Sequence, residues 1–342
     1  MRFIESVFQK LQRHPKRIVF PEGAEPRVLH AAERFVTLKL GIPVLLGDKA
    51  AIEKAAAKQK TSLDHVLILD PATADDLTPF IKYLEKLKRY RDLGPKAARE
   101  MLLRPDYFGA MMVQNGQVDG LVTGASETAS SALRPLIQLI KPQPGVSSIS
   151  SCMMLDLTNK RYGERGVMCF ADCAVIPEPS VEQLAEIAIE SGKLCRQLTG
   201  QKPRVALLSF STKGSSSLAS PQKIAAATAL ARQRAQKSGM EMEIDGELQA
   251  DTALLSDLAE KKAPTSLVAG KANVLVFPDL NSGNIGAKLV QYLAGADAYG
   301  QILLGLSKPC AEMSRGSTED DILAVAAILG VQAVEYRKLY PE

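Results

Sequence analysis

Residues 313–325 read Met-Ser-Arg-Gly-Ser-Thr-Glu-Asp-Asp-Ile-Leu-Ala-Val, a polar loop that runs directly into an apolar helical segment. Ser317 is the expected N-cap of that helix, and Asp320, three residues later, would complete a capping box. Free backbone N–H groups, hydroxyl groups and the guanidinium of Arg315 would meet at the start of such a helix, and together they suit a phosphate group. The stretch therefore predicts an anion site at a junction between a loop and a helix.

The two neighbouring aspartates at this junction differ in the direction that a helix gives them. At about 100° per residue, Asp321 projects between Val325 and Ile328 on the bulky apolar face. Asp320 points away from that face. A carboxylate aimed inward beside an anion site could act as a general base. The alternative is that both acids only favour the helix dipole, and geometry alone leaves both interpretations open.

Short β-rich segments alternate with helical patterns along almost the whole chain. The expected strands are residues 17–20, 43–46, 65–69, 120–123, 167–170, 205–209, 273–277 and 301–306. The expected helices include residues 26–39, 79–92, 129–140, 181–198, 221–238 and 285–293. Such alternation predicts an α/β fold with parallel sheets covered by helices on both faces. The densest Pro/Gly stretch, residues 141–145, is the expected seam between two domains.

The composition favours small anionic ligands over nucleic acids or membranes. The 342 residues carry a net charge of +4, and the basic residues are scattered rather than interleaved with stacking aromatics, so no nucleic-acid surface is expected. No apolar run approaches the length of a membrane span, and residues 1–13 predict an amphipathic helix rather than a signal peptide. The five cysteines lack CxxC spacing and are expected to be free thiols, so a cytoplasmic location is expected.

Two further loops have a pattern that could bind an anion. Residues 123–128 (Thr-Gly-Ala-Ser-Glu-Thr) follow an expected strand and open a helix, although a serine-rich N-cap is the simpler alternative. Arg134 lies in that helix, where its alternative role is to snorkel along an apolar segment. Lys213 lies in a glycine- and serine-rich turn after another strand, but the chain has no GxxxxGK[ST], so a nucleotide P-loop is unsupported.

Nucleophilic and metal-dependent chemistry receive little support from the residue spacing. Cys173 could be a nucleophile, but no histidine lies near it in sequence, and a small buried hydrophobic residue is the favoured interpretation. The histidines at 14, 30 and 65 have neither ligand nor triad spacing. Metal binding and Ser-His-Asp catalysis are therefore not expected.

Seven further blocks, in order along the chain, resemble those of the phosphate acetyltransferase and phosphate butyryltransferase family. They are RIVFPEG (17–23), DGLVTGA (119–125), LRP (133–135), FADCAVIP (170–177), SFSTKGS (209–215), DGELQ (245–249) and FPDLNSGNIG (277–286). Residues 313–321 resemble the C-terminal signature of the same family. The Ser-Arg-Gly and Asp-Gly-Glu-Leu-Gln blocks are most similar to those of the acetyltransferases.

The resemblance implies two α/β/α domains with a cleft between them, as in the isocitrate and isopropylmalate dehydrogenase-like fold. It implies that domain I consists of residues 1–145 and 304–342 and that domain II, residues 146–303, is an insertion. The loop at Ser314 would then return against residues 123–134. Clefts at the carboxyl ends of parallel strands are where such folds bind ligands.

The resemblance also implies an acyltransferase that reversibly converts acetyl-CoA and phosphate into CoA and acetyl phosphate, with CoA as a substrate and no cofactor or metal. Transfer would be direct, in a ternary complex, with Asp321 as the base for the CoA thiol. Arg315 would hold the phosphoryl group, and Ser314 would hydrogen-bond the charge that develops at the reacting centre. Because the family is commonly dimeric, a homodimer is expected.

Substrate binding would use arginines and loop residues from several segments. Near residues 88–94 this chain departs from the family pattern, so Arg89 and Arg91 are both candidates for a CoA contact. The remaining expected contacts to CoA or phosphate are Thr123, Gly124, Ser126, Thr128, Arg134 and Lys213.

The sequence leaves two other functions open. The enzyme could transfer butyryl or propionyl groups instead of acetyl groups. More remotely, it could be a metal- and NAD-dependent decarboxylating dehydrogenase of the same fold, for which Asp245, Glu247 and Asp251 would mimic part of a metal-binding cluster.

Overall fold

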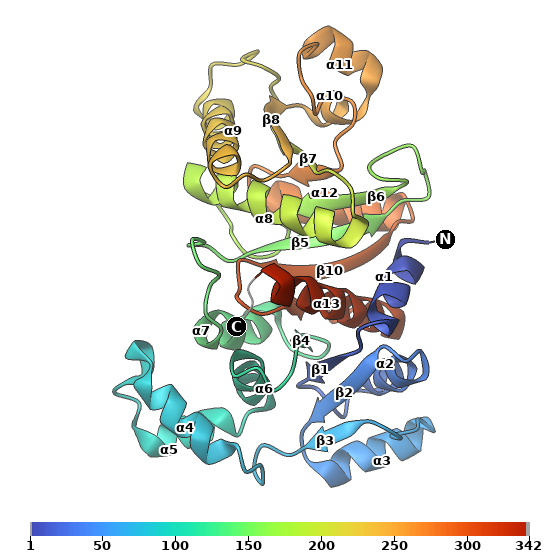
Figure 1. The fold of residues 1–342 in the computed structure, drawn as a ribbon, viewed down its shortest axis with the longest axis vertical. Coiled ribbons are helices and arrows are strands. Elements are labelled where there is room, and N and C mark those ends of the chain that lie inside the picture. The colour runs from blue at the N-terminus through green and yellow to red at the C-terminus, as the bar shows by residue number, and fades with distance from the viewer. Residues whose placement is uncertain (1, 340–342) are drawn as a thin grey trace. The chain divides into compact units, whose positions relative to one another are not determined.

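The chain divides into two units, each built on β-strands covered by helices (Figure 1). Unit 1 is Met1–Lys141 with Leu306–Glu342, and unit 2 is Pro142–Gly305. This computed structural model describes residues 2–339, with the backbone alone for residues 88 and 335–339. Met1, in the expected N-terminal helix, lies outside the described residues. Residues 340–342, in the expected last segment of domain I, also lie outside them.

The strands of unit 1 pair in parallel, in the order β3-β2-β1-β4-β11. They are β1 (Lys16–Phe20), β2 (Gly41–Leu46), β3 (Leu67–Leu69), β4 (Gly120–Thr123) and β11 (Cys310–Glu312). β4 is fully buried, as expected for a central parallel strand covered on both faces. The last strand, β11, comes from the C-terminal part of the chain and pairs with β4, with Glu312 opposite Thr123.

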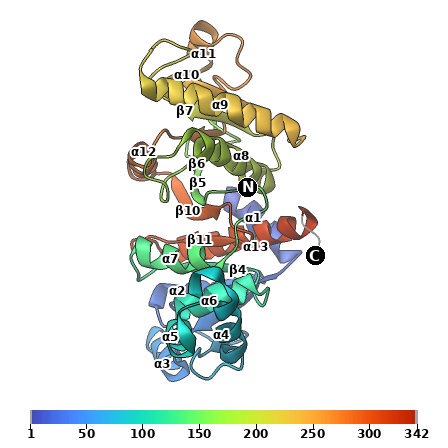
Figure 2. The same cartoon turned by 90° about the vertical axis from the view of Figure 1, so that its left-hand side faces the viewer.

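Helices cover both faces of this sheet, because neighbouring residues of β4 contact different helices. Gly120 faces Leu329 of α13, whereas Leu121 packs against Gly109 of α6. Helices α1, α2 and α13 pack together, and α4, α5, α6 and α7 lie on the side that faces the viewer in Figure 2. The helices of unit 1 are α1 (Phe3–Gln12), α2 (Pro26–Thr37), α3 (Lys49–Gln59), α4 (Leu77–Lys86), the 3₁₀ turn η1 (Lys88–Tyr90), α5 (Gly94–Leu102), α6 (Pro105–Gln114), α7 (Ala129–Leu139) and α13 (Glu319–Leu339).

The strands of unit 2 pair in the order β10-β5-β6-β9-β7-β8, with mixed directions. They are β5 (Ser150–Asp156), β6 (Val167–Ala171), β7 (Arg204–Leu208), β8 (Glu243–Leu248), β9 (Val274–Val276) and β10 (Asp297–Leu304). β6, β9, β7 and β8 are parallel, but β5 runs antiparallel to both β6 and β10. The expectation of purely parallel sheets is therefore wrong here. Residues 157–166, which join β5 to β6, contain no crossover helix, and a parallel pair needs one.

The helices of unit 2 include two long ones that pack against each other. They are α8 (Val181–Thr199), α9 (Ala219–Lys237), α10 (Ala250–Leu254), α11 (Ser256–Lys262) and α12 (Leu280–Leu293). α8 begins with a Ser180–Gln183 capping box and ends at Gly200 in the left-handed conformation, so its bounds follow from its sequence. Among the residues described, no helix has the length and apolar character that crossing a membrane requires.

Candidate active site

In unit 1, two neighbouring loops follow the carboxyl ends of the paired strands β4 and β11. The backbone N–H of Met313 donates to the carbonyl of Thr123 at 2.7 Å, which extends the pairing of the two strands by one residue. Residues 124–128 form the β4–α7 loop, and residues 313–318 form the β11–α13 loop. Each loop ends at a helix N-terminus, where free N–H groups and the helix dipole favour an anion.

Gly124 allows these loops to touch backbone to backbone. Its φ is +99°, in the range that favours glycine, and a Cβ placed there would lie 2.5 Å from the carbonyl oxygen of Met313 and 3.0 Å from its nitrogen. A side chain at position 124 would therefore force the two loops apart. The expected role of Gly124 in the substrate loop thus has a steric basis in the structure.

The capping box of α13 is formed by Thr318 and Asp321, not by Ser317 and Asp320. The backbone N–H of Thr318 donates to Asp321 Oδ2 at 2.8 Å, and the N–H of Asp321 donates to Thr318 Oγ1 at 3.2 Å. The expected box was wrong by one residue because the helix begins at Glu319, and a helix and its N-cap shift together. Asp320 is exposed and forms an ion pair with Arg34, whereas Asp321 is half-buried.

The polar residues expected to hold phosphate line the surface of both loops. Ser314 and Arg315 are exposed, and Ser314 Oγ accepts a hydrogen bond from the N–H of Gly316 at 3.2 Å. Ser126 and Thr128 are also exposed, and the hydroxyl of Thr128 caps α7 by accepting from the N–H of Ser131 at 3.3 Å. The structure thus brings the serine, arginine and aspartate of the C-terminal signature onto the strand-and-loop pair that also carries residues 123–128.

Glu22 and Arg27 also contact these loops, although neither was expected at the site from the sequence pattern. Glu22 Oε1 accepts from the backbone N–H of Gly124 at 2.7 Å and from the buried hydroxyl of Thr123 at 3.3 Å. Thr123 therefore uses its buried hydroxyl to bind Glu22 at the start of the loop. Arg27 donates to backbone carbonyls of both loops. The RIVFPEG block, which ends just before α2, was the sequence feature nearest to these two residues. Nothing in that block indicates a contact with loop residues 98 or more positions further along the chain.

Burial raises the pKa of Glu22, and the hydrogen bonds from Gly124 and Thr123 offset only part of that increase. Its second oxygen, Oε2, is buried and has no hydrogen-bond partner among the described residues. A carboxyl group in this position favours its neutral form more than an exposed one does.

Three arginines expected to contact CoA lie on neighbouring segments of unit 1. Arg134 is exposed on α7, and Arg89 and Arg91 are exposed in and beside η1. The hydroxyl of Tyr90 donates to Gln138 Oε1 at 2.7 Å, one helical turn after Arg134. This bond fixes η1 against α7, so both candidate arginines stay close to the helix that carries Arg134.

Lys213 belongs to unit 2 and lies in the turn that follows β7. Its ammonium group forms an ion pair with Asp245 and donates to the carbonyl of Gly246 at 3.1 Å. Burial tends to raise the pKa of Asp245, but the hydrogen bond from Lys213 and other contacts hold it below its ordinary value. Glu247 Oε1 accepts from the N–H of Gly214 at 2.7 Å. These carboxylates are thus engaged by protein donors, and no group of three metal-ligating side chains occurs among the side chains that the structure describes.

The thiols are free, as expected, and all are buried: Cys152, Cys169, Cys173, Cys195 and Cys310. Burial raises the pKa of Cys173 and Cys310, so these two thiols resist ionisation. The interpretation of Cys173 as a small buried hydrophobic residue is consistent with its complete burial.

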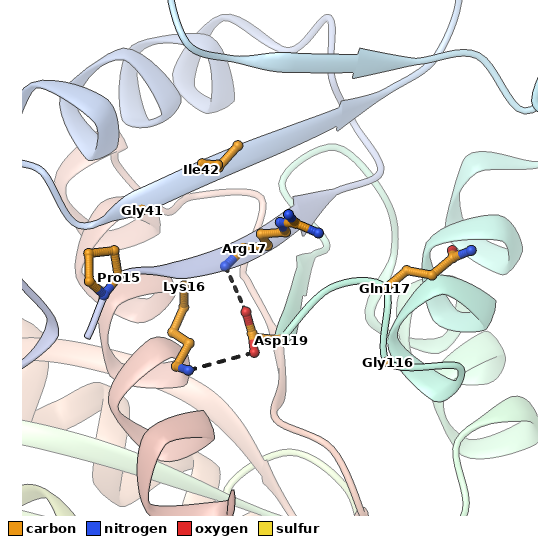
Figure 3. Close-up of a pocket in the computed structure, with 8 residues that line it drawn as sticks. All are labelled: Pro15, Lys16, Arg17, Gly41, Ile42, Gly116, Gln117 and Asp119. Carbon is orange, nitrogen blue, oxygen red and sulfur yellow. Dashed lines mark hydrogen bonds and ion pairs between the residues drawn. The ribbon is translucent and has the colours of Figure 1, made fainter.

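A pocket of about 300 Å³ lies elsewhere in unit 1 (Figure 3). It is lined by Pro15, Lys16, Arg17, Gly41, Ile42, Gly116, Gln117 and Asp119. These residues surround the amino ends of β1, β2 and β4, whereas open parallel sheets bind ligands at the carboxyl ends of their strands. None of the expected site residues lines this pocket, so it is distinct from the candidate active site.

The sequence comparisons identify the family. The model of the phosphate acetyl/butaryl transferase family matches residues 2–329. The chain is 44% identical over 335 residues to a phosphate acetyltransferase of Thermoanaerobacterium thermosaccharolyticum, an alignment that covers 97% of this chain and 100% of the relative. It is 40% identical over 333 residues to the phosphate acetyltransferase of Acetivibrio thermocellus, with 97% and 98% covered. The chain belongs to the phosphate acetyl/butaryl transferase family.

Solved structures agree with this family and with the expected fold. The EutD phosphotransacetylase from Staphylococcus aureus matches with a TM-score of 0.88 and 37% identity, over 97% of this chain and 98% of that one. A phosphotransacetylase from Streptococcus pyogenes matches with a TM-score of 0.89 and 36% identity, over the same shares. A Salmonella typhimurium protein assigned as 4-hydroxythreonine-4-phosphate dehydrogenase, 14% identical with a TM-score of 0.53, shares the fold alone. The expected α/β class and its likeness to dehydrogenase folds are therefore confirmed.

Proposed function

We propose that this protein is a phosphate acetyltransferase, which interconverts acetyl-CoA plus phosphate with CoA plus acetyl phosphate. The observation that carries the proposal is the full-length similarity to phosphate acetyltransferases, combined with the paired loops that present Ser314, Arg315 and Asp321. Two helix N-termini and an exposed guanidinium suit a phosphoryl group at the same place.

In the direction of acetyl-CoA formation, the CoA thiol must lose its proton before its sulfur attacks the acyl carbonyl. A free thiol has a pKa of roughly 8.5, so a base at the site is useful near neutral pH. Asp321 would take the proton, the S–C bond would form, and the C–O bond to phosphate would break with its electron pair leaving on phosphate. The hydrogen bond from Thr318 orients the carboxylate, and such a base contributes about 10²–10⁴-fold to the rate.

Arg315 and Ser314 would act on the phosphate and on the reacting centre. Arg315 would hold the phosphoryl oxygens and favour their departure as phosphate, and Ser314 would donate a hydrogen bond to the charge that develops during transfer. Most of the acceleration would come from holding thiol and acyl phosphate together. Direct transfer within a ternary complex fits the burial of all five thiols, which leaves no accessible cysteine to carry the acetyl group.

CoA, with its several phosphates, would contact the exposed arginines of unit 1. Arg134 on α7 and one of Arg89 and Arg91 would bind its anionic parts. Ser126, Thr128 and the amides beyond Thr123 and Gly124 would face the phosphate end. Lys213 remains a proposed anion contact from unit 2, although its ammonium group is shared with Asp245.

The partner is proposed to be a second copy of this chain. α12 exposes four large apolar side chains, Ile285, Leu289, Tyr292 and Leu293, spaced along one helical stripe. An exposed apolar stripe of this kind is a typical association surface, and symmetric dimers are the commonest soluble assemblies. A cytoplasmic location remains the expectation for a CoA-dependent enzyme with five free thiols.

The arsenolysis assay tests the proposed reaction. Purified protein is given acetyl-CoA and arsenate in the presence of EDTA, without any nucleotide, and loss of the thioester is followed. Arsenate replaces phosphate, and its acetyl ester hydrolyses, so the expected result is continuous, arsenate-dependent loss of acetyl-CoA. Activity only with a divalent metal and NAD would support the dehydrogenase alternative, and faster turnover of butyryl-CoA or propionyl-CoA would assign a longer acyl group.

A further inference from the structure

One side chain outside the expected site binds backbone carbonyls of both loops. Arg27, the second residue of α2, donates from Nη1 to the carbonyl oxygens of Arg315 and Ser317, both at 2.7 Å. From Nη2 it donates to the carbonyl oxygen of Ala125 at 2.6 Å. Its Nε donates to Glu25 Oε1 at 2.6 Å, and that carboxylate also caps α2, so the guanidinium is held in a fixed orientation.

The guanidinium of Arg27 uses most of its N–H donors on protein acceptors, so few remain for a ligand. Its four hydrogen bonds go to Glu25, Ala125, Arg315 and Ser317. The carbonyls come from the β4–α7 loop and the β11–α13 loop, so a single planar group links the two loops. A lysine cannot replace it, because an ammonium group is a point donor without the spread of the guanidinium fork.

Glu22, in the connection that leads from β1 to α2, contacts the β4–α7 loop as well. Glu22 accepts from the N–H of Gly124 at 2.7 Å, next to the Ala125 carbonyl that Arg27 binds. The β1–α2 connection and the start of α2 therefore bind the β4–α7 loop at two neighbouring residues, Gly124 and Ala125. Ser314 and Arg315 themselves are exposed, so the backbone contacts of Arg27 are a main restraint on their placement.

We propose that Arg27 is a positioning residue for acetyl transfer: its guanidinium fixes the β11–α13 loop against the β4–α7 loop and thereby places Arg315 and Ser314. It acts through the backbone of these loops and does not touch the substrates. The inference rests on the proposed function, since it concerns the rate of acetyl transfer at this site.

The test compares Arg27→Ala and Arg27→Lys with Arg34→Ala. Arg34 lies on the same helix and forms an exposed ion pair, so Arg34→Ala removes the same charge without disturbing the loop carbonyls. Turnover and the KM values for CoA and acetyl phosphate are measured for each. A displacement of about 1 Å at a reacting group can cost about 100-fold, so kcat should fall by about that factor in Arg27→Ala. Arg27→Lys should lose most of the activity as well, while Arg34→Ala should stay near wild type.

Two further readouts separate positioning from general stability. The KM for CoA should change by much less than kcat in Arg27→Ala, because the candidate CoA arginines lie on α7 and beside η1. Added methylguanidine at non-denaturing concentration should restore part of kcat in Arg27→Ala and should not affect Arg34→Ala. Thermal melts report the folded fraction at the assay temperature.

Wild-type kcat in Arg27→Ala would overturn the inference. So would a loss that matches the unfolded fraction and does not respond to methylguanidine, since that pattern indicates a structural role alone. If the wild-type protein itself transfers no acetyl group, the proposed function fails, and this outcome is distinguishable because it appears before any variant is compared.

Discussion

At the scale of single residues, the start of α13 assigns different roles to two adjacent acids. Asp321 closes the capping box and is half-buried, and Asp320 is exposed and pairs with Arg34. The sequence pattern predicted that Asp320 would be the more exposed of the two, but it placed the helix start one residue early and assigned the capping box to Asp320 instead of Asp321. A helix boundary depends on which of several hydroxyls takes the cap, and Ser317 and Thr318 are nearly equivalent candidates.

Asp321→Asn should lower kcat by about 100-fold or more, because the amide keeps the shape of the carboxylate but cannot accept the thiol proton. Its oxygen can still accept from the Thr318 N–H, so the fold should be retained. Asp320→Asn breaks an exposed ion pair and should cost about 1 kcal/mol or less of stability, with kcat unchanged. Turnover at saturating substrates, together with thermal melts, distinguishes the two. An inactive Asp320→Asn beside an active Asp321→Asn would assign the base to the other residue.

Glu22 should make stability depend on pH. Burial raises its pKa in the folded chain above the ordinary value of 4.5, so the folded chain holds the proton more tightly than the unfolded chain. The contribution of Glu22 to stability is then fully present below pH 4.5 and is lost as the pH rises through the folded-state pKa. Glu22→Gln cannot ionise, so its melting temperature relative to wild type should increase from pH 4.5 toward neutrality.

Thermal melts across this pH range test the Glu22 prediction. Glu53→Gln, which removes an exposed carboxyl group from α3, is the matched control. A difference between Glu22→Gln and wild type that stays constant or shrinks as the pH rises would contradict the assigned burial effect.

At the scale of elements, the site depends on two loops that touch at Gly124. Gly124→Ala would place a Cβ 2.5 Å from the Met313 carbonyl at a φ of +99°, so it should destabilise the protein by roughly 1–3 kcal/mol and lower kcat. Gly116→Ala is the matched control, since Gly116 also has a positive φ, +74°, but has no atom within 4 Å of the added Cβ. Denaturant unfolding and kcat of both variants should show the larger loss at Gly124. Equal losses would mean that the loop contact is unimportant.

Most strands and helices of the structure overlap a range expected from the sequence, and a few do not. β4 and α7 match their expected ranges almost residue for residue, because apolar runs bounded by Gly and N-cap residues define them. β11 was missed because its sequence, Cys-Ala-Glu, has no β-branched or aromatic residue to mark a strand, whereas the equally short β3 and β9 lie within expected strands. β5 was not among the expected strands, and its antiparallel direction could not be predicted, since strand direction depends on the connection and not on composition.

The candidate site could be predicted only in part for a related reason. Ser314, Arg315 and Asp321 stand in a contiguous block, and a contiguous block is visible as a motif. Arg27 reaches the carbonyls of Ala125 and Ser317 across 98 and 290 residues, and such backbone contacts leave no local pattern.

At the scale of the whole molecule, we expect a symmetric homodimer that uses the apolar stripe of α12. Light scattering at micromolar concentration should give twice the chain mass. The double variant Leu289→Asp/Leu293→Asp places charge within that stripe and should shift the mass toward the monomer. Leu67→Asp, at an exposed apolar position of unit 1, is the control and should remain dimeric. A monomeric wild-type protein would contradict the expected assembly.

We expect that this protein transfers acetyl directly between CoA and phosphate, without an acetyl-enzyme intermediate. Isotope exchange between acetyl phosphate and labelled inorganic phosphate tests it most directly, because exchange requires the acetyl–phosphate bond to break and re-form. Direct transfer predicts exchange when CoA is present and none when CoA is removed, as the burial of all five thiols also favours. Exchange that persists without CoA would reveal an acetylated protein group and contradict direct transfer, and no exchange even with CoA would contradict the activity itself.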